Sequence, residues 1–136
     1  MVRGYTTIEQ SKKLLSLGLD PNTADMCYPH FVRYGADTYN EIPEIAEDID
    51  YPYEMPCWSL AALLELMPAK INSNEEYYRL TSHKSLFNGE FFKPYLLFYK
   101  NFANKRIYEV NRDNFVDAAF EMVCWLIEQG HIKVNK

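Results

Sequence analysis

The sequence predicts an α+β fold, in which a small antiparallel β-meander of about three strands packs with three helices. The first indication is a set of three stretches with helical apolar spacing, each preceded by a residue that caps helices well. The second is an aromatic middle region in which strand-like runs alternate with turn signals. The chain has 136 residues, a length that suits one domain, so we assign residues 1–136 to a single globular domain.

The first helix is expected to begin at Thr6 or Thr7. Glu9 and Gln10 each follow one of these threonines by three residues, which is the spacing of a capping box. In that motif each side chain binds a backbone amide that the first turn leaves without a partner. Gly18 suits the end of this helix, because a left-handed conformation is common just after the last turn.

Two more helices are expected further along the chain. The shorter one lies between Ser59, a good N-cap, and Pro68, which ends the leucine-rich run. The last one lies between Asn114, which forms a pattern resembling a capping box with Asp117, and Gly130. Only a narrow polar stripe interrupts the apolar surface of this C-terminal helix, so we expect it to be central to the core.

The middle of the chain is expected to form the meander. Its strand candidates are residues 77–83, 91–100 and 106–110. Asn88-Gly89, between the first two candidates, is the strongest short-range hairpin signal. Upstream, residues 27–34 are predicted to be a short edge strand, because Pro29 has no amide proton to donate. Residues 38–55 are predicted to be an irregular or edge-strand segment.

The net charge of −5 is unevenly distributed along the chain. Residues 37–69 carry eight acidic groups and no Lys or Arg, whereas residues 70–112 carry eight basic and four acidic groups. An acidic protein is poorly suited to non-specific nucleic-acid binding, which depends on neutralising phosphates. We expect the acidic and basic segments either to lie against each other or to face different partners.

Several sequence features bear on the compartment. No uncharged apolar run, such as that of residues 60–64, reaches the length of a signal peptide or a membrane span. We therefore expect a cytoplasmic protein without a membrane partner. The three cysteines, Cys27, Cys57 and Cys124, are odd in number and widely spaced, which predicts reduced and mostly buried thiols rather than disulfides.

One candidate for a chemical site lies at residues 20–30. Cys27 and His30 have a Cys-x-x-His spacing, and Asp20 and Asp25 are near them in the sequence. Such a set is compatible with a nucleophilic site or with half of a metal site. Complete metal-binding, phosphate-binding and nucleophile-elbow motifs are absent from the sequence, so we expect no metal and no cofactor.

Aromatic residues make up 15% of the chain, and two groups of them are candidates for binding. Tyr51, Tyr53 and Trp58 lie beside the acidic run and form our candidate interface, because Tyr and Trp combine a large apolar area with a polar tip. The second group lies on the expected sheet among basic residues, where rings can stack on single-stranded nucleic acid: Tyr77, Tyr78, Tyr95, Tyr99 and Tyr108. The alternative role of these aromatics is to complete a small core.

These observations predict a non-enzymatic interaction module that binds a protein or a second copy of itself. Two alternatives stay open. One is a nucleic-acid role, either binding through the basic residues 70–112 or mimicry of nucleic acid through the acidic residues 37–54. The other is a small enzyme that uses the Cys, His and Asp residues of the segment 20–30.

Three segments resemble those of a known family: residues 18–26, residues 56–60 with their leucine-rich continuation, and residues 113–122. The family consists of short proteins with no assigned activity, encoded by gut anaerobes and by their phages and mobile elements. The chain departs from the family pattern at Phe115, where a proline is expected in the first helical turn. The resemblance implies an intracellular accessory protein of phage or integrated-element origin, and it carries over no functional residue.

Leu126→Asp is expected to unfold the domain. Leu126 belongs to the apolar surface of the last expected helix, and burying one leucine there contributes about 1.5–3 kcal/mol. A carboxylate in the same place is buried without a partner and is strongly unfavourable. Thermal unfolding followed by circular dichroism checks the prediction, and a variant that melts within a few degrees of the parent would contradict the central position of this helix.

Overall fold

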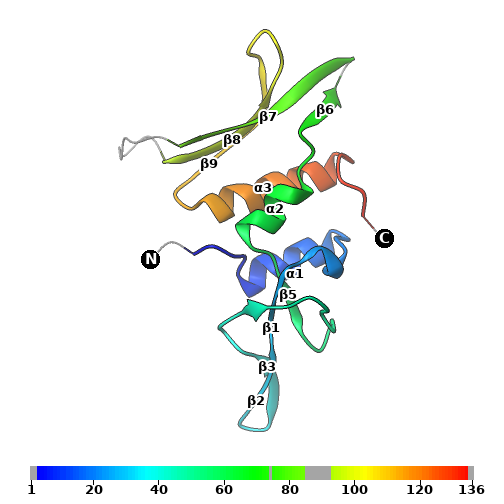
Figure 1. Cartoon of the computed structure of the whole chain (residues 1–136), viewed down its shortest axis with the longest axis vertical. Coiled ribbons are helices and arrows are strands. Elements are labelled where there is room, and N and C mark those ends of the chain that lie inside the picture. Colours follow the sequence, from blue (N-terminus) through cyan, green and yellow to red (C-terminus); the bar gives the residue numbers. More distant parts are fainter. Residues whose placement is uncertain (1–2, 74, 85–92, 135–136) are drawn as a thin grey trace.

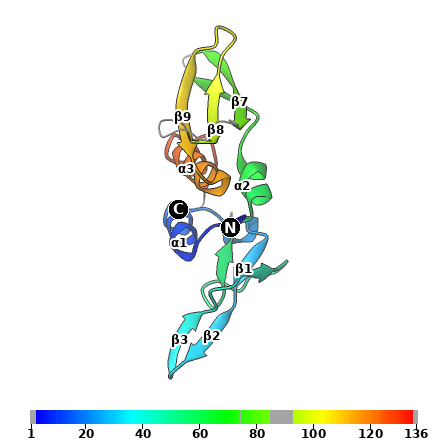
Figure 2. The same cartoon turned by 90° about the vertical axis from the view of Figure 1, so that its left-hand side faces the viewer.

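The structure, a computed structural model, describes residues 3–73, 75–84 and 93–134 and has an α+β fold (Figure 1). The α-helices of this part of the chain are α1 (Ile8–Ser16), α2 (Leu60–Leu66) and α3 (Phe115–Glu128). A four-stranded sheet forms one end of an elongated molecule, α2 and α3 lie beneath it, and α1 lies below them. A smaller sheet and a protruding hairpin form the other end, as Figure 2 also shows.

The helix starts follow the local signals in the sequence. Thr7 caps α1 in the expected capping box: its hydroxyl accepts from the amide of Gln10 at 3.1 Å, and Gln10 Oε1 accepts from the amide of Thr7 at 3.0 Å. Ser59 caps α2. Asn114 caps α3 by accepting from an amide two residues on, but the capping box with Asp117 does not form, because Asp117 binds side chains near the N-terminus instead.

The meander has one strand more than predicted. Its strands run antiparallel in the order β6 (Lys70–Ser73), β7 (Glu76–Lys84), β8 (Tyr95–Lys100) and β9 (Arg106–Arg112). The last three match the strand candidates, and β6 is the addition. β6 has only four residues, and Ile71 is its one buried apolar side chain, so its sequence shows no strand pattern. Only pairing with β7 makes β6 a strand. The hairpin expected at Asn88-Gly89 lies outside the described residues.

The acid-rich half of the chain holds more strands than the sequence indicated. They are β1 (Met26–Tyr28), β2 (His30–Arg33), β3 (Ala36–Tyr39), β4 (Glu44–Ile45) and β5 (Met55–Cys57). A small sheet has the order β4-β1-β5, and β2 pairs with β3 as a separate hairpin. The edge strand expected at residues 27–34 is therefore two strands, which divide at Pro29, a residue that cannot donate to a ladder.

Helix α3 is central to the core, as predicted. Buried residues occupy most of its circumference: Val116, Ala118, Ala119, Met122, Val123, Cys124, Leu126 and Ile127. The inner face of the four-stranded sheet covers one side of α3, with Leu97 and Tyr99 fully buried, and α2 covers another side with Leu63. An ion pair holds the polar edge of the helix: Arg112 Nη2 donates to Oε1 of Glu121 at 2.7 Å, and Arg112 Nε lies 2.6 Å from Oε2 of the same carboxylate.

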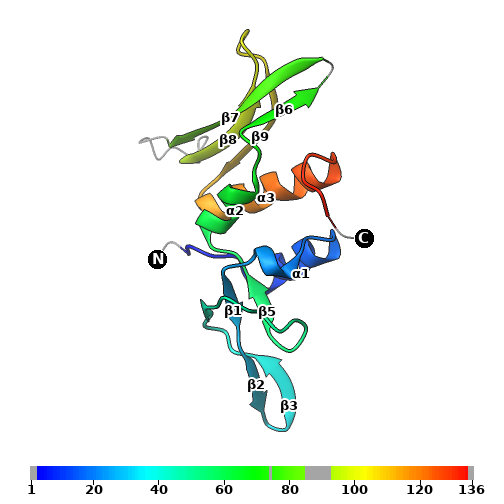
Figure 3. The ribbon, with the colours of Figure 1, turned by 45° about the vertical axis from the view of Figure 1, so that its right-hand side comes forward.

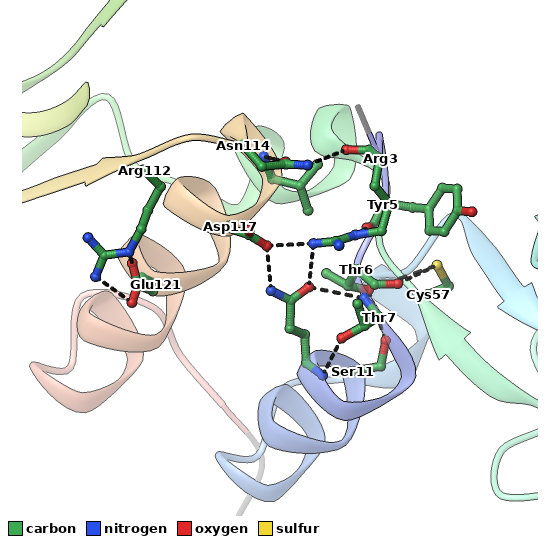
Figure 4. Close-up of polar contacts among 12 residues, drawn as sticks. Arg3, Tyr5, Thr6, Thr7, Ser11, Cys57, Arg112, Asn114, Asp117 and Glu121 are labelled. Carbon is green, nitrogen blue, oxygen red and sulfur yellow. Dashed lines mark hydrogen bonds and ion pairs between the residues drawn. The ribbon is translucent and has the colours of Figure 1, made fainter. Parts of the chain in front are cut away.

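A buried polar cluster around Thr6 joins α1 to the smaller sheet (Figure 4). The Thr6 hydroxyl accepts from the amide of Trp58 at 3.1 Å and lies 2.8 Å from the hydroxyl of Ser11, and both Thr6 and Ser11 are fully buried. The backbone oxygen of Thr6 accepts from the Tyr28 hydroxyl at 2.7 Å. The N-terminal segment, α1, β1 and the start of α2 therefore meet at one residue.

A second polar cluster joins the N-terminal segment to α3. The Asp117 carboxylate accepts from the Arg3 guanidinium and from Gln10 Nε2, the latter at 2.8 Å (Figure 4). Asn114 donates to the backbone oxygen of Arg3 at 3.2 Å. Figure 3 shows the result: α1 lies between the layer formed by α2 and α3 and the smaller sheet.

Thr6→Val is expected to lower the free energy of unfolding by about 1–3 kcal/mol, because it keeps the shape of the side chain and leaves the Trp58 amide and the Ser11 hydroxyl without their buried partner. Urea unfolding measures the change. The matched control is Thr81→Val on β7, a half-buried residue whose hydroxyl makes one long hydrogen bond of 3.5 Å. Equal losses in the two variants would contradict a special role for the Thr6 cluster.

Candidate functional site

The most exposed apolar surface of the described chain lies on residues 30–54, which we call the arm. The arm consists of the β2–β3 hairpin and the segment that returns to β5. It carries seven large apolar residues that are at least 44% exposed: Phe31, Val32, Tyr34, Ile42, Ile45, Tyr51 and Tyr53. Exposed apolar surface concentrated in this way marks interaction sites in folded proteins.

A tight turn shapes the tip of the hairpin. Arg33 pairs with Ala36 across a two-residue loop, and both loop residues have positive φ, +52° at Tyr34 and +77° at Gly35. This is the conformation of the turns that match the twist of paired strands. Only glycine adopts it without strain, so Tyr34 is held there by the pairing and presents its ring to solvent, 94% exposed.

The base of the arm is held by contacts between the hairpin and the returning segment. The His30 ring stacks on Tyr53 at 4.2 Å, and its Nε2 lies 3.1 Å from Oδ1 of Asp37. The Tyr39 hydroxyl donates to the backbone oxygen of Pro52 at 2.6 Å. These contacts orient the predicted interface residue Tyr53, which keeps 57% of its surface exposed.

Tyr51 and Trp58, the other two residues of the predicted interface, have different surroundings. Tyr51 is 44% exposed and lines a shallow hollow of about 250 Å³ beside the C-terminal end of α1. Trp58 is fully buried, and its indole Nε1 donates to the Thr23 hydroxyl at 3.0 Å. Including Trp58 in an interface was therefore wrong: the polar tip that suggested a surface residue is satisfied inside the core.

The residues of the alternative site at 20–30 each have a partner outside that set. Asp20 caps a short 3-10 helix at Pro21–Thr23, and Asp25 accepts from the amide and hydroxyl of Ser59. Cys27 donates its thiol proton to Glu54 at 3.5 Å, whereas the His30 ring contacts Tyr53 and Asp37. A nucleophile and its base must be within hydrogen-bond reach, and the described contacts do not pair Cys27 with His30.

The three thiols are poorly suited to nucleophilic chemistry. Burial raises the pKa of Cys27 to about 11, and the nearby Glu54 carboxylate acts in the same direction. Burial likewise raises the pKa of Cys57 to about 11 and of Cys124 to about 12. The thiolate is the reactive form of cysteine, so all three side chains are kept in the unreactive form at neutral pH. Within the described residues, no three His, Cys, Asp or Glu side chains gather in a way that would hold a metal ion.

Most of the predicted sheet tyrosines serve the core. Tyr78 and Tyr99 are buried on the inner face of the sheet, Tyr95 packs on Phe115, and Tyr108 stacks on Trp125 at 4.6 Å. Tyr77 is the exception, because it lies on the outer face and is 62% exposed.

A basic groove of about 520 Å³ lies on this outer face. Its lining, which defines the groove, is Lys70, Tyr77, Arg79, Lys100, Asn101, Phe102 and Asn104. Arg79 is opposite both Lys70 and Lys100 in the strand register, so three cations form a row across β6, β7 and β8. The sequence did not reveal this row, because its members are far apart along the chain and only strand pairing brings them together.

Comparison of the chain with protein-family models, with curated proteins and with solved structures finds no match. Membership of the family that the chain resembles therefore stays a prediction. Among the helices of residues 3–73, 75–84 and 93–134, none is both long and apolar enough to cross a membrane.

The native protein is expected to resist thiol-reactive reagents at pH 8. Because the three raised thiol pKa values keep the thiolate fraction small, labelling should be slow in the folded state and should speed up as the pH rises toward 11. Labelling with a chromogenic disulfide reagent, followed by absorbance, measures this. The unfolded protein in urea is the control and should label at all three cysteines. Rapid labelling of Cys27 in the native protein would instead support a reactive site there.

Proposed function

We propose that this protein is a binding module and that its arm is the surface that contacts a protein partner, including a second copy of the same chain. One observation carries the proposal: the arm concentrates exposed apolar side chains on a hairpin and on the segment that follows it, and little of the remaining chain covers them. The β2 strand illustrates this, since Phe31 and Val32 are 45% and 58% exposed.

Physical chemistry supports this use of the arm. An isolated two-stranded hairpin is marginally stable in water, so a hairpin of this kind gains from a partner that covers it. Each square ångström of apolar surface removed from water contributes about 25 cal/mol. Tyrosines such as Tyr34 and Tyr53 combine a large apolar ring with a hydroxyl, which suits the centre of an interface.

The other two functions that the sequence left open have less support. An enzyme built on residues 20–30 needs a reactive thiol near a base, whereas the pKa of Cys27 is raised and its thiol contacts an acid, Glu54. A nucleic-acid role has the basic groove in its favour, but the net charge of the chain is −5. The resemblance to proteins of gut anaerobes, phages and mobile elements is compatible with an accessory binding role.

Val32→Ser combined with Ile45→Ser is expected to weaken the complexes of the arm at least about ten-fold, which corresponds to about 1.4 kcal/mol of binding free energy. Both side chains are more than half exposed, so the fold should keep its melting temperature. Size-exclusion chromatography with light scattering over a range of concentrations detects self-association, and affinity capture with a tagged chain detects other protein partners.

The matched control is Ala61→Ser, which removes exposed apolar surface from α2, outside the arm. It should leave every complex unchanged. A parent protein that stays strictly monomeric and retains no partner would contradict the proposed function, and so would complexes that survive the double substitution in the arm.

A further inference from the structure

The acidic arm and the basic groove lie at opposite ends of the molecule. The acidic residues of the arm are at the end formed by β2, β3 and the smaller sheet, and the basic groove is on the four-stranded sheet at the other end (Figures 1 and 2). The helices lie between them, so the acidic residues of the arm do not meet the basic groove within one chain. Of the two arrangements that the charge pattern suggested, contact between the acidic arm and the basic groove within one chain is therefore ruled out.

The groove presents positive charge that the described chain does not neutralise. Within residues 3–73, 75–84 and 93–134, the cations Lys70, Arg79 and Lys100 make no ion pair with a carboxylate. By contrast, Arg106, the next cation in the same row, is paired with Glu109 at 3.0 Å. An occupant that brings carboxylates would complete the pairing of the row.

The groove is also aromatic. Phe102, in the turn between β8 and β9, is 87% exposed, and Tyr77 on β7 is 62% exposed. The Arg79 guanidinium lies 5.5 Å from the centroid of the Phe102 ring, close enough for a cation–π contact. Such a surface favours an occupant in which acidic and apolar side chains alternate.

Residues 41–48 of the arm have that chemistry. The segment reads Glu-Ile-Pro-Glu-Ile-Ala-Glu-Asp, with four acidic residues and no Lys or Arg. All four acidic side chains are exposed, and Ile42 and Ile45 between them are 74% and 86% exposed. β4, at the centre of this segment, is an edge strand of the smaller sheet, so one side of its backbone has no strand neighbour in the described chain.

We propose that residues 41–48 of one copy dock in the basic groove of a second copy, so that the protein assembles head to tail. The proposal rests on the proposed function, because the arm is the binding surface in both, and it names the partner and the partner's site. The two contacting surfaces are different, so the interface is heterologous, and repeating it produces a ring or an open chain of copies. Charge complementarity also makes the assembly sensitive to salt, which screens exposed charges.

A second copy fits the groove better than single-stranded nucleic acid does. Nucleic acid would meet the same three cations and two aromatic rings, but it would also approach a chain with a net charge of −5. The arm supplies carboxylates for the cations and isoleucines for Tyr77 and Phe102.

The test uses two neutralising double variants. Glu44→Gln with Glu47→Gln disables the arm and keeps the groove, and Arg79→Gln with Lys100→Gln disables the groove and keeps the arm. Each variant alone should sediment as a monomer at concentrations where the parent forms larger species. An equimolar mixture should form a 1:1 dimer, because one intact arm meets one intact groove and the remaining ends cannot extend the chain.

Parent assemblies should dissociate at about 1 M salt, where the Debye length is about 3 Å.

The control is Lys12→Gln with Lys133→Gln, which removes the same charge from exposed positions outside the groove and should assemble like the parent. If the groove variant assembles as well as the parent, head-to-tail docking is wrong, while the proposed function of the arm survives. A monomeric parent also overturns the docking, and the function of the arm then depends on capture of a different protein. Binding of a fluorescent oligothymidine that needs Arg79 and Lys100, without any self-association, would assign the groove to nucleic acid and overturn the docking.

Discussion

The burial of α3 is the constraint on which the rest of the structure depends. A helix that is apolar around most of its circumference has to be covered from more than one side. The four-stranded sheet covers one side through residues such as Leu97 and Tyr99, and α2 covers another through Leu63. The chain therefore stacks in layers along one direction, with the sheet at one end and α1 and the smaller sheet toward the other (Figure 1).

Two polar clusters connect α1 and the N-terminal segment to the smaller sheet and to α3. Thr6 binds Trp58, Ser11 and Tyr28, and Asp117 binds Arg3 and Gln10. Because their polar groups are wholly or partly shielded from water, leaving one without its partner costs more free energy than the bond itself contributes. The layered arrangement also separates the acidic arm from the basic groove, and the rest of the described chain covers neither surface.

The sequence predicted the parts of this structure that local interactions decide. The capping box of Thr7 and Gln10 and the central position of α3 were predicted correctly, because each depends on residues within a few turns of one helix. Of the three candidate interface residues, Tyr51 and Tyr53 are exposed, whereas Trp58 is buried because its indole finds its partner in Thr23, 35 residues away. The short strands β5 and β6 were missed for a similar reason, since three or four residues carry too little pattern to be recognised without their partner strands.

By itself, then, the sequence determined the α+β class, the three helices, and the acidic character of residues 37–69 and the basic character of residues 70–112, because these follow from residue spacing and composition. Only the tertiary structure decided that Lys70, Arg79 and Lys100 form one row, that Cys27 and His30 have separate partners, and that the arm and the groove lie at opposite ends of the molecule. Each of these relations joins residues that are distant along the chain or point in different directions, so it depends on how the layers cover α3 and not on any local pattern.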